Sequence, residues 1–364
     1  MQRDLRFKIF IPLFLLGAVL LVSAGNDKIA ADNAKGDFSG DSLRLENEVH
    51  LKNIRQLSFG GENAECYFSP DGTKFSFQST HGNLECDQIF SMDIDGNNWK
   101  MVSTGKGRTT CSYYLPDNKT VLFASTHEVD PNCPPKPDLS QGYVWALYDT
   151  YDIYTADESG TDLKKLTNSK GYDAEATISP VGDKIVFTST RSGDIEIYTM
   201  NLDGSDVTQL TSELGYDGGP FFSNDGKKII YRRTTFRDED EINEYKTLLA
   251  QGLIKPSQLD IWIMDADGSN KRQITDNSSA NFAPFFFPDG EKILFCSNID
   301  SENKRNFDVY KINIDGTGLE RITWFNEFDG FPMFSPDGKK LVFCSNRNGK
   351  VKGETNIFIC DWVD

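Results

Sequence analysis

Polar side chains recur at two fixed places along this 364-residue chain, counted from a tight turn that the sequence repeats six times. One set follows each turn and carries histidine and arginine: His81, His127, Arg191, Thr235, Ile299 and Arg347. The other set precedes each turn and is small and polar: Asn63, Thr109, Asp173, Asp217, Asn281 and Asp329. Glu65 and Glu175 follow two members of this second set. Guanidinium and imidazole groups bind anions, and carboxylates orient amines or amides, so these residues are candidates for ligand binding.

A purely structural role explains the set before the turn better than the set after it. Asx and hydroxyl side chains cap turns, and this role accounts for the six-fold recurrence before the turn. The set with histidine and arginine is less regular, and a mixed ring of such groups at a concave mouth is typical of a binding site. His81 and His127, together with carboxylates, are also candidate metal ligands, which keeps a metal-dependent hydrolase or lyase open as the alternative function.

Other catalytic and metal-binding patterns do not occur in the sequence. A serine hydrolase of the common type needs a Gly-x-Ser-x-Gly elbow, and a zinc site needs paired Cys or His at short spacing. The several Asp-Gly pairs are typical of hairpin turns rather than of calcium-binding loops. We therefore predict no catalytic residue, no cofactor and no dedicated metal site.

The chain has seven cysteines, and two of them differ from the rest in their surroundings. Cys86 and Cys133 stand in connections that leave the second strand of adjacent repeats, so we predict a disulfide between them. The remaining cysteines fall in predicted strands, where a thiol acts as a small apolar side chain: Cys66, Cys111, Cys296, Cys344 and Cys360.

The elements that must position these residues come from two repeated anchors. The first is an aromatic strand that runs into the turn: YFSPDGTKFSF from Tyr67, YYLPDNKTVLF from Tyr113, TISPVGDKIVF from Thr177, FFSNDGKKIIY from Phe221, FFFPDGEKILF from Phe285 and MFSPDGKKLVF from Met333. The second is a strand, a turn and a short strand, as in IYTADESGTDLKKLT from Ile153. Each repeat therefore supplies four short strands, and six such units predict an all-β, six-bladed β-propeller.

The last repeat lacks its fourth strand, while the segment Asn53–Ser58 near the other end reads as a strand without a partner. We predict that this N-terminal strand completes the last blade and closes the ring. Two repeats carry insertions, at residues 127–150 and 235–259. In the second, Asp238 and Glu241 form a capping-box pattern ahead of an apolar face, which predicts one short helix. Its role as a lid, as a docking element or as a packed decoration stays open.

The N-terminal residues predict export. A basic head, an apolar run and small residues make residues 1–24 a signal peptide cleaved after Ala24, which leaves no membrane span in the mature chain. Residues 25–48 are polar and predict a flexible lead-in, and residues 49–364 form a single propeller. The net charge of −17 disfavours nucleic acid as a partner. The expected location is the periplasm or the medium outside the cell.

The phrases FSPDGKK, EIYTMNLDGSDVTQLT and GYDAEATISP resemble the TolB-like, WD-repeat-like propeller of exported bacterial proteins. Members of that family bind partner proteins or peptides, so the resemblance implies the same for this chain. We predict a non-enzymatic propeller that binds a peptide, protein or anionic ligand at the funnel mouth of its channel.

Overall fold

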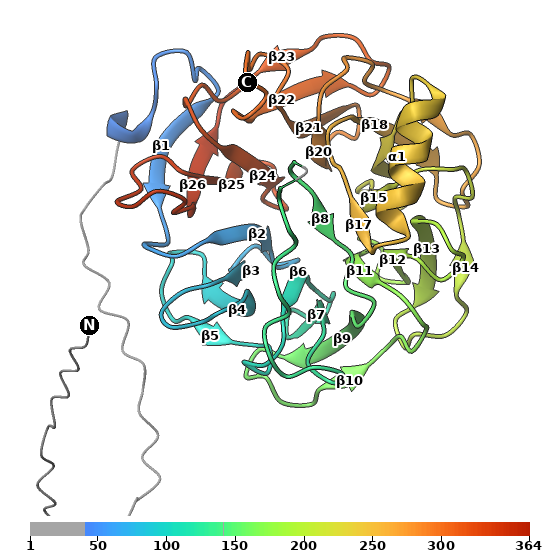
Figure 1. Cartoon of the computed structure of the whole chain (residues 1–364). Coiled ribbons are helices and arrows are strands. Elements are labelled where there is room, and N and C mark those ends of the chain that lie inside the picture. The colour runs from blue at the N-terminus through green and yellow to red at the C-terminus, as the bar shows by residue number, and fades with distance from the viewer. Residues whose placement is uncertain (1–40, 141) are drawn as a thin grey trace, which may run out of the picture. The chain divides into compact units, whose positions relative to one another are not determined.

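A computed structural model describes residues 41–140 and 142–364 (Figure 1). The predicted signal peptide and most of the predicted lead-in lie outside the described residues. Within the described part of the chain, no helix is both long and apolar enough to cross a membrane.

Six four-stranded antiparallel sheets are arranged in a ring as the blades of a propeller (Figure 1). The first three blades, each from its inner strand outward, are β2 (Asn63–Phe68), β3 (Lys74–Ser79), β4 (Gln88–Asp93) and β5 (Lys100–Met101); β6 (Thr109–Tyr114), β7 (Thr120–Ser125), β9 (Asp152–Asp157) and β10 (Lys164–Lys165); β11 (Asp173–Ile178), β12 (Lys184–Ser189), β13 (Glu196–Asn201) and β14 (Thr208–Gln209). The next two are β15 (Asp217–Phe222), β16 (Lys228–Thr234), β18 (Leu259–Asp265) and β19 (Arg272–Gln273); β20 (Asn281–Phe286), β21 (Lys292–Ser297), β22 (Asp308–Asn313) and β23 (Glu320–Arg321). The predicted fold class is confirmed.

The sixth blade joins the two ends of the propeller. It consists of β24 (Asp329–Phe334), β25 (Lys340–Ser345), β26 (Asn356–Trp362) and the N-terminal β1 (Leu51–Gln56), which pairs antiparallel with β26. This is the predicted ring closure, with the strand starting two residues earlier than expected. Pairing of β1 covers the edge that the last repeat would otherwise expose.

Apolar packing between blades follows the first anchor of the repeat. In the second strand of every blade, the fourth residue is aromatic and has no exposed surface: Phe77, Phe123, Phe187, Tyr231, Phe295 and Phe343. Because each ring fills the space against a neighbouring blade, removing one would leave a large cavity, and Phe→Ala changes in such cores cost about 3–5 kcal/mol. The repeat therefore encodes the blade and its packing together.

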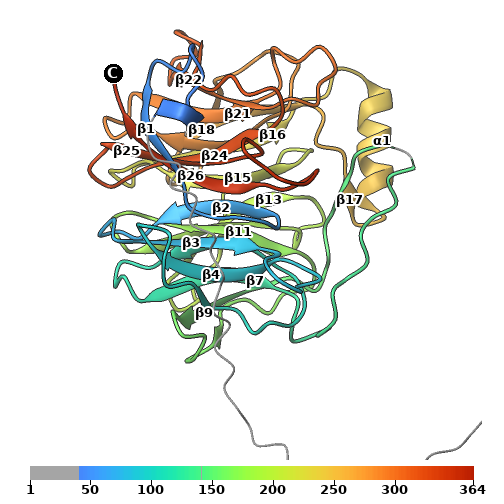
Figure 2. The ribbon, with the colours of Figure 1, turned by 90° about the vertical axis from the view of Figure 1, so that its left-hand side faces the viewer.

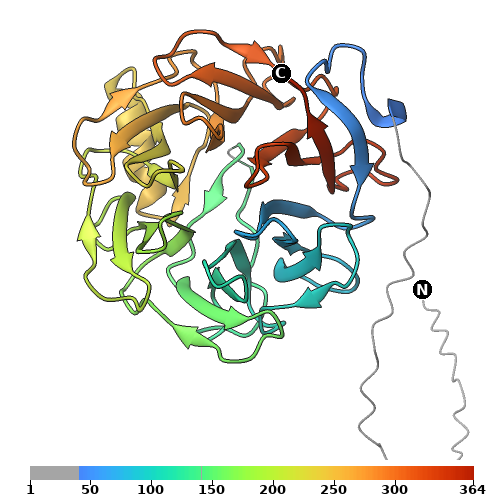
Figure 3. The same ribbon diagram turned by 180° about the vertical axis from the view of Figure 1, so that it is seen from behind.

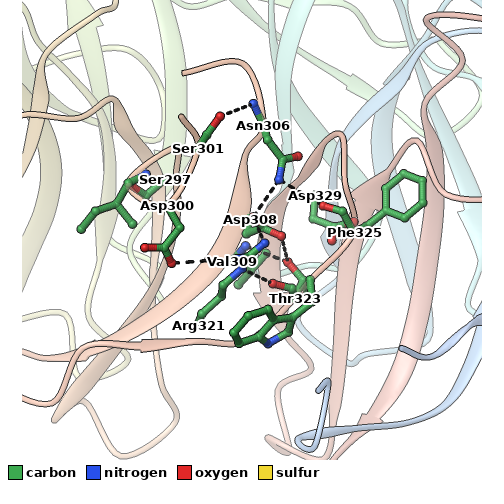
Figure 4. A network of polar contacts seen from close by, with 12 residues as sticks. Ser297, Asp300, Ser301, Asn306, Asp308, Val309, Arg321, Thr323, Phe325 and Asp329 are labelled. Atoms are coloured by element: carbon green, nitrogen blue, oxygen red, sulfur yellow. Dashed lines mark hydrogen bonds and ion pairs between the residues drawn. The ribbon is translucent and has the colours of Figure 1, made fainter. Parts of the chain in front are cut away.

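A hydroxyl group links the third and fourth strands of each blade, a role that the sequence analysis did not foresee. In the fifth blade, the Thr323 hydroxyl accepts the backbone N–H of Val309 at 2.9 Å, and the side chain of Asp308 lies beside it (Figure 4). In the sixth blade the equivalent group is Ser58, which accepts the N–H of Ile357 at 2.8 Å and donates to Asn356. The N-terminal segment thus closes the ring with the same contact that the other blades make internally.

Both insertions lie on one face of the propeller, where a helix stands beside the blades (Figure 2). Helix α1 (Glu239–Leu249) begins as predicted, with the Asp238 carboxylate accepting the N–H of Glu241 at 3.0 Å, and it buries Tyr245 and Leu248. The Glu241 side chain bonds Arg237 instead of returning to the cap. Seen from the opposite face, α1 lies behind the blades (Figure 3).

The end of the predicted lead-in is fixed to the propeller. Glu48 is fully buried, and its carboxylate accepts two hydrogen bonds from the Arg347 guanidinium at 2.8 and 3.1 Å. It also accepts the backbone N–H of Trp324. A buried carboxylate needs such partners, so Glu48, the last residue of the predicted lead-in, is held against the propeller.

Candidate functional site

A cavity of about 640 Å³ lies where the inner strands begin, on the face that carries the insertions. Its cover is formed by residues 133–140 and 142–148, here called the strap, which lie in front of the inner strands (Figure 1). Within the strap, β8 (Trp145–Ala146) pairs with β17 (Leu253–Ile254) from the second insertion. The backbone N–H of Leu147 donates to Gly252 at 2.7 Å, so each insertion holds the other in place.

The floor of the cavity is built from one repeat position. The third residue of each inner strand lies at a β-bulge and has a φ between 49° and 57°: Glu65, Cys111, Glu175, Gly219, Ala283 and Phe331, here called the floor ring. All six line a smaller space of about 30 Å³, and four of them, Glu65, Cys111, Glu175 and Phe331, also line the cavity. A bulge re-aims the side chain that it displaces. The same backbone device therefore presents a different chemical group from each blade.

A hydrogen-bonded network occupies one side of this ring. The Tyr216 hydroxyl donates to Glu175 at 2.8 Å and accepts from the Nε of Arg232 at 2.8 Å, and Arg232 also contacts Glu175 directly. Glu175 further accepts the N–H of Gly219 at 2.9 Å and the hydroxyl of Thr188 at 2.7 Å. The carboxylate and the guanidinium are each satisfied, so this buried pair is stable in place.

Two consecutive glycines make room for that network. A Cβ on Gly218 would come within 2.7 Å of a Glu175 oxygen, and one on Gly219 within 3.0 Å of the Arg232 guanidinium carbon. The other inner strands carry larger residues at the floor-ring position. The Gly-Gly step of the fourth blade is therefore the local sequence feature that admits Arg232 to the channel.

Glu65 faces the same space from the first blade. The pKa of its carboxyl is raised to about 7, mainly by burial and to a smaller extent by the charge of nearby Glu175. A hydrogen bond with Cys111 and the charge of Arg232 act in the opposite direction. Burial also raises the pKa of the Cys111 thiol, which is therefore neutral and donates to the Glu65 carboxylate.

Among the described residues, nine aromatic side chains line the cavity. The strap and the second to fourth blades supply Tyr143, Trp145, Tyr148, Tyr151, Tyr172 and Tyr216, and the fifth and sixth blades supply Phe282, Phe328 and Phe331. The Arg232 guanidinium lies over the rings of Trp145 and Tyr216, at 5.1 and 5.2 Å. Such cation–π contacts tie the strap to the fourth blade.

A disulfide anchors the start of the strap. Cys86 and Cys133, the pair singled out from the sequence, are joined in the structure with their Cα atoms 5.7 Å apart. Beside them, Arg108 donates to Asp87 at 2.9 Å, and both residues line the rim of the cavity. The disulfide connects a loop of the first blade to the insertion of the second blade.

The charged residues of the two recurring sets pair with one another inside their own blades. Arg191 contacts both oxygens of the fully buried Asp173 at 3.0 Å. Arg347 bonds Asp329 at 2.8 Å in addition to Glu48. These pairs lock the start of an inner strand to the end of the second strand, and none of the four residues lines the cavity.

Three further candidates, Asp217, His81 and His127, also lie outside the cavity. Asp217 is buried with Arg233 at 3.6 Å, His81 packs on Trp99, and the His127 ring packs on Tyr154 at 4.6 Å. Of the nine residues proposed from sequence, the structure brings Glu65 and Glu175 together at the cavity. Among residues 41–140 and 142–364, no group of three or more His, Cys, Asp or Glu side chains is arranged to hold a metal ion.

Comparison with known proteins supports the fold. The chain resembles a TolB of Acinetobacter baumannii, with 22% identity, a TM-score of 0.52, and coverage of 71% of this chain and 53% of that one. It also resembles a putative TolB of Agrobacterium tumefaciens, with 19% identity, a TM-score of 0.54, and coverage of 85% and 97%. At these identities the likeness concerns the fold alone.

Sequence comparison identifies the family through a family model. An uncharacterized protein of Agrobacterium fabrum strain C58 is 27% identical over 122 residues, a match that spans 34% of this chain and 34% of that protein's length. The family model described as the TolB β-propeller domain matches residues 136–251 and 246–359, which together make up more than half of the chain. The chain therefore belongs to the TolB β-propeller domain family.

Proposed function

We propose that this protein is an exported, non-enzymatic binding propeller, and that its cavity beneath the strap holds a segment of a peptide or protein partner. The observation that carries this proposal is the cavity itself, with its aromatic side chains, its polar floor and the strap that covers it. Its volume of about 640 Å³ lies within the roughly 300–1,000 Å³ typical of ligand pockets.

The composition of the walls supports a partner that offers both apolar and polar groups. Aromatic rings supply contact area at a low cost in conformational entropy, and they are enriched where proteins bind proteins. Tyr143 is 66% exposed although it lines the cavity, so it stands at the entrance where a partner would first meet the strap.

The structure changes which residues we assign to binding. Arg191 and Arg347 were expected to attract an anionic group, but each guanidinium already pairs with carboxylates of its own surroundings. His81 and His127 do not line the cavity, so the alternative of a metal-dependent hydrolase or lyase draws no support from it. The revised assignment is the floor ring together with the aromatic side chains of the strap.

Export remains part of the proposal. It rests on the signal-peptide pattern of residues 1–24 and fits a disulfide between Cys86 and Cys133, since such bonds persist in oxidising compartments. N-terminal sequencing of the mature protein recovered from an envelope fraction should begin at Gly25. A mature protein that starts at Met1 would contradict export by this route.

The binding proposal is tested by capture followed by titration. Partners captured from an envelope extract are purified and titrated against the unmodified protein and against Tyr143→Ala. Loss of an aromatic anchor at a binding site typically costs about 2 kcal/mol or more, so the affinity should fall at least about tenfold.

The matched control is Val351→Ala, because Val351 is 68% exposed but does not line the cavity. It should bind the partner as the unmodified protein does. Equal affinity for Tyr143→Ala and Val351→Ala would place the binding surface elsewhere on the propeller.

A further inference from the structure

We propose that the cavity recognises a primary ammonium group, as carried by a peptide N-terminus or a lysine side chain, through the Glu65 carboxylate and the aromatic rings around it. This inference rests on the proposed function and adds the chemical class of the bound group.

The charges around the cavity leave Glu65 as the acid without a cationic partner at the floor. Four acidic residues line the cavity, Glu62, Glu65, Asp87 and Glu175, against three basic ones, Arg108, Lys136 and Arg232. Arg108 pairs with Asp87 and Arg232 pairs with Glu175. Glu62 and Lys136 are exposed at the rim. Among the described residues, the Glu65 carboxylate has the neutral Cys111 thiol as its hydrogen-bond partner, and Arg232 acts on it through charge alone, so the carboxylate keeps acceptor capacity for a ligand.

The walls suit a cation as well. The cavity already places one guanidinium, that of Arg232, over the rings of Trp145 and Tyr216. Tyr148, Tyr151 and Tyr172 extend this aromatic surface around the remaining space. An ammonium group that bonds Glu65 would share the cavity with these aromatic rings, whose faces attract cations.

An anion has no comparable partner. The Arg232 side chain is committed to Glu175 and Tyr216 and is 8% exposed. Arg108 is committed to Asp87. A carboxylate or phosphate would have to displace one of these contacts and would also face the charge of Glu65, which makes an anionic ligand unfavourable.

The protonation state of Glu65 provides a specific signature. The groups that shift the pKa of the Glu65 carboxyl are Cys111, Glu175, Arg232 and Asp87. In turn, burial and the charge of Glu65 raise the pKa of Tyr67 and of Cys344. Burial raises the pKa of the Glu65 carboxyl to about 7. An ammonium ligand binds the ionised form, so its affinity should rise as the pH increases through this pKa. From about pH 6 to about pH 8 the ionised fraction changes roughly tenfold, and the affinity should change by about the same factor.

The experiment uses three small aromatic probes that differ in charge: phenethylamine, 2-phenylethanol and phenylacetate. Their dissociation constants are measured by ligand-observed NMR on the mature protein at about pH 6 and about pH 8, and on Glu65→Gln and Glu62→Gln. Phenethylamine should bind at least about tenfold more tightly than the alcohol at the higher pH. Glu65→Gln should abolish both this preference and the pH dependence, while Glu62→Gln should retain both.

The outcomes separate the ligand class from the cavity. If phenylacetate binds best, or if phenethylamine binds without a preference that depends on Glu65, the ammonium proposal is wrong although the cavity still binds ligands. If no probe saturates on the unmodified protein, the cavity is not a binding site and the proposed function fails with the inference. If Glu65→Gln does not fold, the test uses the unmodified protein alone. The affinity for phenethylamine, relative to that for the alcohol, should then rise between about pH 6 and about pH 8, and an unchanged ratio would contradict the proposal.

Discussion

At the scale of single residues, one repeat position performs different chemistry in different blades. The floor ring contains two carboxyl groups, a thiol, a glycine, a methyl group and a phenyl ring, all presented by the same bulge with positive φ. Only one of these positions is glycine, so in the other five blades an L-residue carries the strain of the left-handed region, of order 1–2 kcal/mol each. This cost places side chains in the channel, where they can meet a ligand.

At Gly219, both the backbone angle and the space around the Cα atom disfavour a side chain. Gly219→Ala should lower the free energy of unfolding by more than the roughly 1 kcal/mol expected for alanine at positive φ, since its Cβ meets the Arg232 guanidinium. Urea unfolding measures the change. The matched control is Gly82→Ala, which has a φ of 75° but nothing within 4 Å of the added Cβ. Equal losses for both variants would show that crowding at Arg232 has no energetic weight.

At the scale of elements, three kinds of contact hold the strap in place. The disulfide fixes its start, β8 pairs with β17, and Trp145 packs beneath α1 in a cluster with Tyr216 and Tyr245. The second insertion therefore acts as a support for the first. The open question of its role is answered in part, because α1 is a packed element that holds the cover of the cavity.

Breaking the disulfide should loosen the strap more than the blades. In the double variant Cys86→Ser, Cys133→Ser we expect faster amide hydrogen exchange over residues 133–148 and a loss of stability of roughly 2–4 kcal/mol. Reductant should reproduce both effects in the unmodified protein. The control is the double variant itself, which reductant should leave unchanged. Unaltered exchange in the strap after reduction would mean that β8–β17 pairing suffices to hold it.

At the scale of the whole molecule, ring closure depends on a segment that precedes the first repeat. Strand β1, the Ser58 hydroxyl and the Glu48 carboxylate all attach to the sixth blade. A propeller of four-stranded blades buries its cores between neighbours, so an incomplete last blade exposes apolar surface on two sides. The contacts of Glu48 and Arg347 extend this attachment beyond the strand.

Deleting residues 25–60 should therefore lower the melting temperature sharply or make the protein insoluble. The deletion removes β1 and leaves the Arg347 guanidinium buried with one of its two carboxylate partners missing, a loss that is strongly destabilising. Calorimetry of the soluble fraction measures the effect. The control is a deletion of residues 25–40, which retains Glu48 and β1. Its melting temperature separates the stability contributed by Glu48 and β1 from any contribution of residues 25–40. A protein lacking residues 25–60 that melts with the full-length chain would refute closure by β1.

The sequence alone determined the architecture. Six copies of the aromatic strand and turn specified the blades, the orphan strand at Asn53–Ser58 specified how the ring closes, and Asp238 specified where the helix begins. These features could be predicted because turn chemistry, strand alternation and capping act over a few residues, and repetition multiplies their signal.

Only the tertiary structure decided the site. The repeat position of Arg191 and Arg347 suggested a ligand, but folding sets each beside a buried carboxylate of its own blade, and local patterns do not reveal such partners. The bulges that turn Glu65 and Glu175 into the channel occur at residues other than glycine, so no sequence signal marks them. The strap contributes Trp145, which meets Ile254 across more than a hundred residues of chain. Contacts of that range follow from the packing of blades and insertions, which is why the cavity could not be read from the sequence.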